Sequence, residues 1–135
     1  MSKREKIFER EEPEVYQYGL PGGWTVLVGK TARDNEILSI KYASPRDWWF
    51  HVRSMPGSHV LLLVRSGEEP DKDTLKRAAS IAAFHSKARG GGTVPVSGTR
   101  AQYVTKPRGA PPGTVQIRKE TVFKVRPALP EEAEV

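Results

Sequence analysis

Runs of apolar and β-branched residues predict the strands along this chain. Two such runs flank the glycine-rich turn at 21–23, and two more flank the break at 54–58, which indicates two hairpins. The run 59–65 is almost continuously apolar, so we expect a central strand that is covered on both faces. The expected strands are 15–20, 24–29, 48–53, 59–65, 94–96, 101–105, 114–117 and 121–125.

A helical period of small apolar residues predicts one main helix over about 73–89. Leucine and alanine recur at helical spacing from Leu75 to Ala83, and Asp71 or Asp73 can cap the start. The glycines at 90–92 would end this helix. The order of the elements predicts an α+β fold, a single domain in which a largely antiparallel mixed β-sheet packs against this helix.

The composition fits one domain with polar ends. The chain has 135 residues and no cysteine, which excludes disulfide scaffolds, thiolate zinc sites and cysteine nucleophiles. We expect a polar N-terminal tail over 1–14, a folded domain over 15–126 and an acidic C-terminal tail over 127–135. The charged start and the short apolar runs argue against a signal peptide and a membrane span, so we expect a cytoplasmic protein with no membrane partner.

Positive charge is concentrated in the second half of the chain. The net charge is +6, but residues 86–126 hold nine Lys or Arg side chains and a single acid, Glu120. A basic block inside a folded region favours a polyanionic partner, with nucleic acid ahead of a membrane. An evenly solvated basic surface is the alternative.

Two histidines follow distinctive segments and would meet if the flanking strands pair. His51 ends an aromatic run, and His59 follows the 54–58 turn. Such a pair could cleave RNA by acid and base catalysis, one histidine taking the 2′-OH proton and the other protonating the leaving oxygen. A metal site would need a third ligand such as Asp47. Structural or RNA-contacting histidines are the more frequent alternative, and Asp47 is more typical of a backbone cap.

Three further segments suit nucleic acid. Trp48 and Trp49 must point to opposite faces of a strand, and an exposed indole would offer a surface on which a base can stack. Pro56 followed by Gly57 favours a type II turn, which could present backbone N–H groups to a phosphate. The loop 106–113 is cationic and stiffened by proline, which lowers the entropic cost of presenting its charges.

Taken in order, these segments resemble the NFACT-R domain family over about residues 15–126. The strongest part of the match is the pairing of Asp47-Trp48-Trp49-Phe50-His51 with Pro56-Gly57-Ser58-His59-Val60. The supporting segments are Val28-Gly29-Lys30-Thr31-Ala32-Arg33-Asp34-Asn35-Glu36, Ser86-Lys87-Ala88-Arg89, residues 104–113 and Glu120-Thr121.

This resemblance implies an RNA-binding module of the kind found in the ribosome quality control factors RqcH, Tae2 and NEMF. Those proteins bind tRNA and obstructed large ribosomal subunits, and their other domains do not fit in 135 residues, so we expect a stand-alone copy. The expected partner is RNA, either tRNA or ribosomal RNA, with the large ribosomal subunit as a further candidate. The resemblance also implies a short helix over about 32–42.

We expect RNA binding rather than catalysis, without a metal or a cofactor; a nuclease that uses His51 and His59 is the alternative. The oligomeric state stays open. His59 is expected to be exposed, so that His59→Ala would keep the melting temperature. The candidate phosphate contacts are Lys30, Arg33, Arg53, Lys87, Arg89, Lys106 and Arg108, and the candidate pocket is Trp49, His51, Ser58 and His59.

Overall fold

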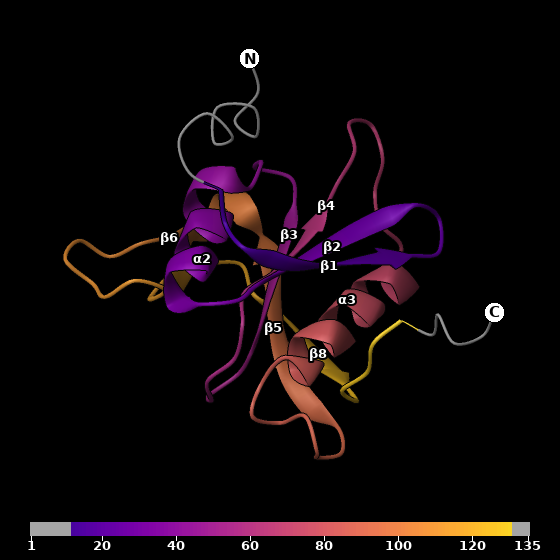
Figure 1. Cartoon of the computed structure of the whole chain (residues 1–135). Helices are drawn as coiled ribbons and strands as arrows, with labels where there is room; N and C mark the ends of the chain where they lie inside the picture. Colours follow the sequence, from indigo (N-terminus) through magenta and orange to yellow (C-terminus); the bar gives the residue numbers. More distant parts are fainter. Residues whose placement is uncertain (1–11, 131–135) are drawn as a thin grey trace.

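A six-stranded sheet forms the centre of the molecule (Figure 1) in a computed structural model that describes residues 12–130. The strand order is β1-β2-β4-β3-β5-β8, and each pairing of described strands is antiparallel, so the expected mixed character is absent from this region. A separate two-stranded sheet, β6-β7, lies beside it. The strands are β1 Val15–Leu20, β2 Trp24–Gly29, β3 Trp48–Val52, β4 Val60–Leu63, β5 Val94–Arg100, β6 Val104–Thr105, β7 Gln116–Ile117 and β8 Thr121–Val125.

Helices cover both faces of the sheet, and each face has its own core. The helix α3, Lys72–Phe84, packs on one face, where Val60 and Leu62 are fully buried. On the other face the short helix α2, Ala32–Glu36, continues as a π-helix, η1, over Ile37–Tyr42, and Leu38 packs there against Leu61. The α+β prediction, the central position of β4 and the helix at 32–42 are therefore confirmed.

The main helix ends at Phe84, five residues before the predicted end. Beyond it the chain turns to meet the β3–β4 loop, where the Ser58 N–H donates to the carbonyl of His85 and the Lys87 N–H donates to the carbonyl of Pro56. The Ser86 hydroxyl donates to the carbonyl of Ala83, which is one of the free acceptors at the helix end. Long-range pairing therefore ends the helix, and the glycines at 90–92 lie beyond it.

Gly57 does not have the positive φ that the predicted type II turn requires. It serves instead for close packing, because a Cβ on Gly57 would lie 2.9 Å from the Cβ of Ser86 and 3.0 Å from a methyl group of Val52. The N–H of Ser58 bonds to His85 and is not presented to solvent. The sequence predicted that this turn presents backbone N–H groups to a phosphate, and for the N–H of Ser58 that prediction is wrong.

The later segments differ from prediction in detail. The strand expected over 94–96 extends to Arg100, and the one expected over 101–105 begins as a 3-10 helix, η2, at Ala101–Tyr103. Most of both predicted tails lies outside the described residues, but Leu129 packs on the core. No helix within 12–130 combines the length and apolar character needed to cross a bilayer.

Candidate functional site

Strand β3 places its aromatic residues on two faces, as the alternation predicts. Trp48 stacks on Phe50 on the α3 side, while Trp49 stacks on His51 on the side of α2 and η1, with ring centroids 6.0 Å apart in both pairs. Trp49 is only 3% exposed. It is therefore not an open stacking surface, because the polypeptide already covers it.

His59 is a buried histidine held by neighbours from three other elements. Its Nδ1 lies 2.7 Å from the hydroxyl oxygen of Ser39 in η1, and the same oxygen accepts a hydrogen bond from the indole N–H of Trp49. Its backbone N–H donates to the side-chain oxygen of Asn35 in α2. We call Asn35, Ser39, Trp49 and His59 the histidine cluster. With 4% of its surface accessible, His59 is not the exposed residue that the sequence predicted.

The surroundings of the two histidines favour their neutral forms. Burial, followed by the proximity of His51, lowers the pKa of His59 to about 4, although hydrogen bonds with the backbone of Gly113 and Asn35 act in the opposite direction. Burial also lowers the pKa of His51, against hydrogen bonds with the backbone of Gly57 and Val52. The two rings approach edge to face at 5.6 Å between centroids, as the predicted strand pairing required.

Close packing and helix capping explain several of the residues in the segment 29–36. Asn35 occupies the space where a side chain of Gly29 would be, since a Cβ there would lie 2.1 Å from the Asn35 side-chain oxygen. Thr31 caps α2 by accepting from the N–H of Asp34. Asp34 in turn accepts from the N–H of Glu14. This segment therefore fixes Asn35 against the start of β4.

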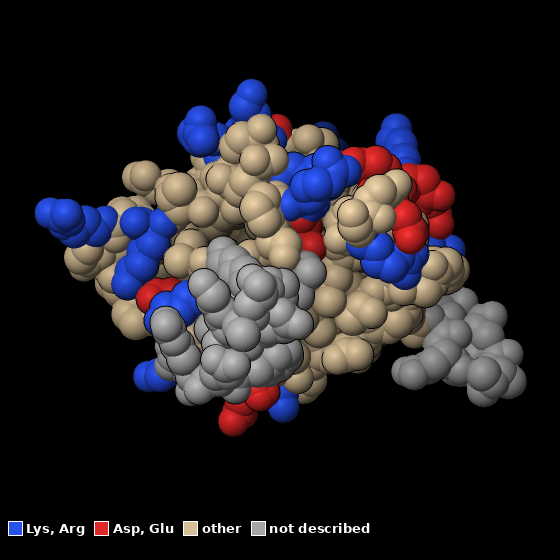
Figure 2. Space-filling view, turned by 90° about the horizontal axis from the view of Figure 1, so that it is seen from above, with Lys and Arg blue, Asp and Glu red and all other residues tan. Residues whose placement is uncertain are grey.

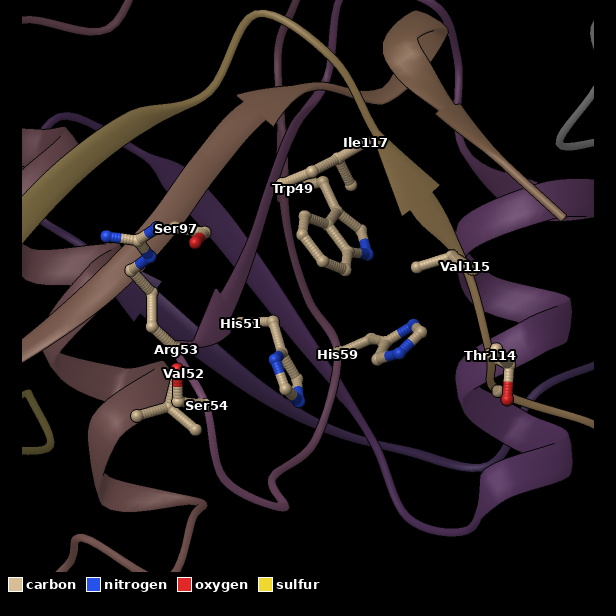
Figure 3. A pocket seen from close by; sticks show the side chains of 11 residues that line it. Trp49, His51, Val52, Arg53, Ser54, His59, Ser97, Thr114, Val115 and Ile117 are labelled. Atoms are coloured by element: carbon tan, nitrogen blue, oxygen red, sulfur yellow. The ribbon is translucent and has the colours of Figure 1, made fainter. Parts of the chain in front are cut away.

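A pocket of about 350 Å³ opens beside the histidine cluster, between the end of β3 and the segment 113–117. In Figure 3 the rings of Trp49, His51 and His59 converge, and Val115 points between them. Three of the four predicted pocket residues therefore line one cavity. Ser58, the fourth, is not part of its lining.

Asp47 lies at the other end of β3 and serves the backbone. It is fully buried, and its two carboxylate oxygens accept from the N–H groups of Ser44 and Val64, both at 2.8 Å. This is the capping role that the sequence favoured for it. Among residues 12–130, no three His, Asp or Glu side chains come close enough to hold a metal ion.

The basic loop, residues 106–113, is attached to α2 at both of its ends by one carboxylate. Glu36 pairs with the ammonium of Lys106 at 3.1 Å, and its other oxygen accepts from the N–H of Gly113 at 3.1 Å. Arg108 lies in the exposed part of the loop between these attachments. Glu36 was not among the site residues predicted from the sequence, because its two partners lie 70 and 77 residues away along the chain.

The remaining predicted cations lie around the same end of the sheet. Arg53, at the pocket, pairs with Glu120 at 3.3 Å. Lys30 lies 4.8 Å from the ring centre of Tyr16, and Arg33 is exposed on α2. Arg89 covers Phe84 at the end of α3, where Lys87 also lies, next to the β3–β4 loop.

The predicted cations thus lie on two sides of the His51–His59 pair. Lys87 and Arg89 lie on one side, and the basic loop with Lys106 and Arg108 lies on the other. Ser86, next to Lys87, bridges to Gly57, while Gly113, at the end of the basic loop, lines the pocket. In Figure 2 blue side chains project from the left side of the molecule, where Figure 1 places the loop beside β6, and have little red near them. On the right side of that view, blue and red side chains lie together.

Comparison with known proteins identifies the family. Residues 15–119 match the family described as the NFACT protein RNA binding domain. The Rqc2 homolog RqcH of Bacillus subtilis (strain 168) is 43% identical over 122 residues, which make up 90% of this chain and 21% of RqcH. Coiled-coil domain-containing protein 25 of Mus musculus is 44% identical over 66 residues, 47% of this chain and 31% of that protein. The Ribosome quality control complex subunit NEMF homolog of Drosophila melanogaster is 30% identical over 86 residues, 64% of this chain and 8% of that protein.

A solved structure agrees with this assignment. The C-terminal part of the fibronectin/fibrinogen-binding protein from Streptococcus suis superposes with a TM-score of 0.77 and 34% sequence identity, over 99% of this chain and 51% of that one. The chain spans about a fifth of the length of the RqcH proteins that it matches. It belongs to the NFACT RNA-binding domain family.

Proposed function

We propose that this domain binds structured RNA, such as tRNA or ribosomal RNA, and that it does so in the cytoplasm during ribosome quality control, on the large ribosomal subunit. Membership of a family described by RNA binding supports the ligand class. The name of the Drosophila relative, a ribosome quality control complex subunit, supports the process.

The observation that carries the proposal is a group of cations that do not form ion pairs with any residue of 12–130. Arg108 extends from the basic loop, while Arg118 and Lys119 lie 5.4 and 5.5 Å from the ring centre of Tyr103. The neighbouring acid, Glu120, is already engaged by Arg53 and Ser97. Cations without acidic partners can neutralise phosphates without first losing an ion pair.

We further propose that the domain binds RNA without cleaving it. The Nδ1 atom of His59 is engaged by Ser39, and the backbone of Gly113 and Asn35 also contacts the ring through hydrogen bonds. A histidine with its pKa near 4 is a poor base at neutral pH, because catalytic pKa values usually lie near the working pH. These contacts favour a positioning role for His59.

The test is a titration of the protein against tRNA and against a neutral polymer of similar size at two salt concentrations. We expect binding to tRNA that weakens steeply with salt, because each neutralised phosphate releases counterions. Salt-independent binding, or equal binding to the neutral polymer, would overturn the proposal. Incubation of a fluorescent RNA with the protein tests the second part, since cleavage that disappears in His51→Ala would make the domain a nuclease.

A further inference from the structure

The pocket beside His51 differs from the surrounding surface because its lining combines apolar side chains with hydroxyl groups and carries no unbalanced charge. Val52, Val115 and Ile117 supply aliphatic walls, and Ser54, Ser97 and Thr114 supply hydroxyl groups. The single cation of the lining is Arg53, and its charge is balanced by Glu120. The lining therefore offers no unpaired cation to a phosphate. A flat, neutral group with a polar edge could instead contact the aliphatic side chains with its faces and the hydroxyl groups with its edge.

The backbone at the pocket rim is held in conformations that few residues adopt. Ser54 has a φ of 62°, which is uncommon for a residue other than glycine, asparagine or aspartate. Such strain persists only where the surrounding structure holds it in place, and it is frequent at functional sites. On the opposite rim Gly113 has a φ of 87°, and a Cβ there would lie 3.3 Å from the carbonyl oxygen of Ala32. Both rims of the pocket therefore have backbone conformations that most residues would adopt only with strain.

We propose that this pocket receives one unpaired base of the bound RNA. The proposal rests on the RNA binding argued above and adds which feature of the RNA is selected. A nucleobase is neutral and flat, with hydrogen-bonding groups along its edge, and His51 and the hydroxyl groups can meet that edge while the aliphatic side chains contact its faces. A cavity of about 350 Å³ has room for one base.

The position of the pocket between two sets of cations supports this assignment. The basic loop lies beyond Gly113, and Lys87 lies beyond the β3–β4 loop, so a strand whose base enters the pocket has cations along its backbone on both sides. A paired base cannot leave its helix without breaking its pair, so bulges, loops and ends are the sites that fit. The domain should therefore prefer RNA that carries an unpaired nucleotide.

The experiment uses short RNA hairpins with one bulged nucleotide, either A, C, G or U, and a matched hairpin whose bulge lacks its base. All of them carry the same number of phosphates, so the electrostatic part of binding is constant. We expect the wild-type chain to bind at least one bulged hairpin roughly 5- to 150-fold more tightly than the abasic hairpin, a difference of the size that contacts with a single base contribute. Fluorescence anisotropy at one fixed salt concentration measures both affinities.

Two variants locate the effect. Val115→Trp fills the pocket and should bind all hairpins as the wild-type chain binds the abasic one. Gln17→Trp adds the same side chain at an exposed position on β1, at the other edge of the sheet, and should keep the preference. If Val115→Trp lowers the melting temperature, His51→Phe is used in its place. His51→Phe keeps an aromatic ring but removes the ring nitrogens that form hydrogen bonds, so it should reduce the preference for the bulged hairpin over the abasic one.

The outcomes separate this proposal from the function on which it rests. Equal wild-type affinity for all bulged and abasic hairpins would overturn the base pocket while leaving RNA binding intact. A preference that survives both Val115→Trp and His51→Phe would likewise overturn it, because the base would then bind elsewhere. Absence of salt-sensitive binding to every hairpin would instead remove RNA binding itself, and the pocket assignment with it.

Discussion

The histidine cluster and the basic loop are neighbours, but the cluster is buried and the tip of the loop is exposed. In the cluster, Trp49 and His59 are almost wholly buried and are joined through the hydroxyl of Ser39. In the loop, Arg108 is exposed, and one carboxylate, that of Glu36, ties both ends to α2. Buried polar networks fix geometry, because breaking them leaves groups unsatisfied, whereas exposed cations contribute affinity that salt can screen. The cluster should therefore control folding, and the loop should control RNA affinity.

Replacing His59 should have the largest effect on stability. His59→Ala leaves a cavity and removes one of the two hydrogen-bond partners of the Ser39 hydroxyl in a buried site, so we expect a loss of about 2–4 kcal/mol in the free energy of unfolding. Urea denaturation measures it. His85→Ala is the matched control, because His85 is only partly buried, and it should cost less. A loss below about 0.5 kcal/mol for His59→Ala would show that the cluster does not hold the fold.

The neutral state of His59 should also make stability depend on pH. Its folded pKa of about 4 lies below the ordinary 6.5, so the unfolded chain binds more protons between these two values, and stability falls as pH is lowered through that range. We expect a loss of about 2 kcal/mol between pH 7 and pH 5 from this group, with His51 acting in the same direction.

Urea denaturation at the two pH values tests this dependence. His59→Gln should show a smaller loss over the same interval, because the titrating group is gone. A loss as large as that of the wild-type chain would assign the pH dependence to other groups.

Local patterns predicted the elements that depend on neighbouring residues. Alternation placed Trp48 and Trp49 on opposite faces, and the apolar run before Arg65 identified a central strand. The same pairing brought His51 and His59 together as expected. Each of these features follows from the strand period and one short turn.

Long-range contacts account for what the sequence did not predict. The main helix ends early because Ser86 packs against Gly57. The sequence had instead indicated the glycines at 90–92 as the end of the helix. The burial of His59 depends on Ser39, twenty residues away, and the basic loop depends on Glu36. The resemblance had marked the segment that contains Glu36 without indicating what that residue contacts.

Replacing Arg108 should separate affinity from folding. Arg108→Gln removes one exposed cation, so we expect roughly a tenfold weaker binding to every RNA and a salt dependence reduced by about one phosphate contact. The melting temperature should stay that of the wild-type chain, because the side chain is exposed. Arg77→Gln on α3, whose guanidinium pairs with Asp73, is the control and should leave RNA affinity unchanged. Unaltered binding by Arg108→Gln would remove the loop tip from the RNA surface.

The smallest effect is expected where the two regions join. Glu36→Gln keeps an oxygen that can accept from the N–H of Gly113 but removes the negative charge next to Lys106. The ion pair is partly exposed, so its loss should lower the free energy of unfolding by less than about 1 kcal/mol. Lys106 would then be available to phosphates, and RNA affinity should rise by less than about threefold, while Lys106→Gln lowers it. If Glu36→Gln instead weakens RNA binding as much as Lys106→Gln does, the attachment of the loop to α2 matters more than the charge of Lys106, and the basic loop shares the positioning role of the histidine cluster.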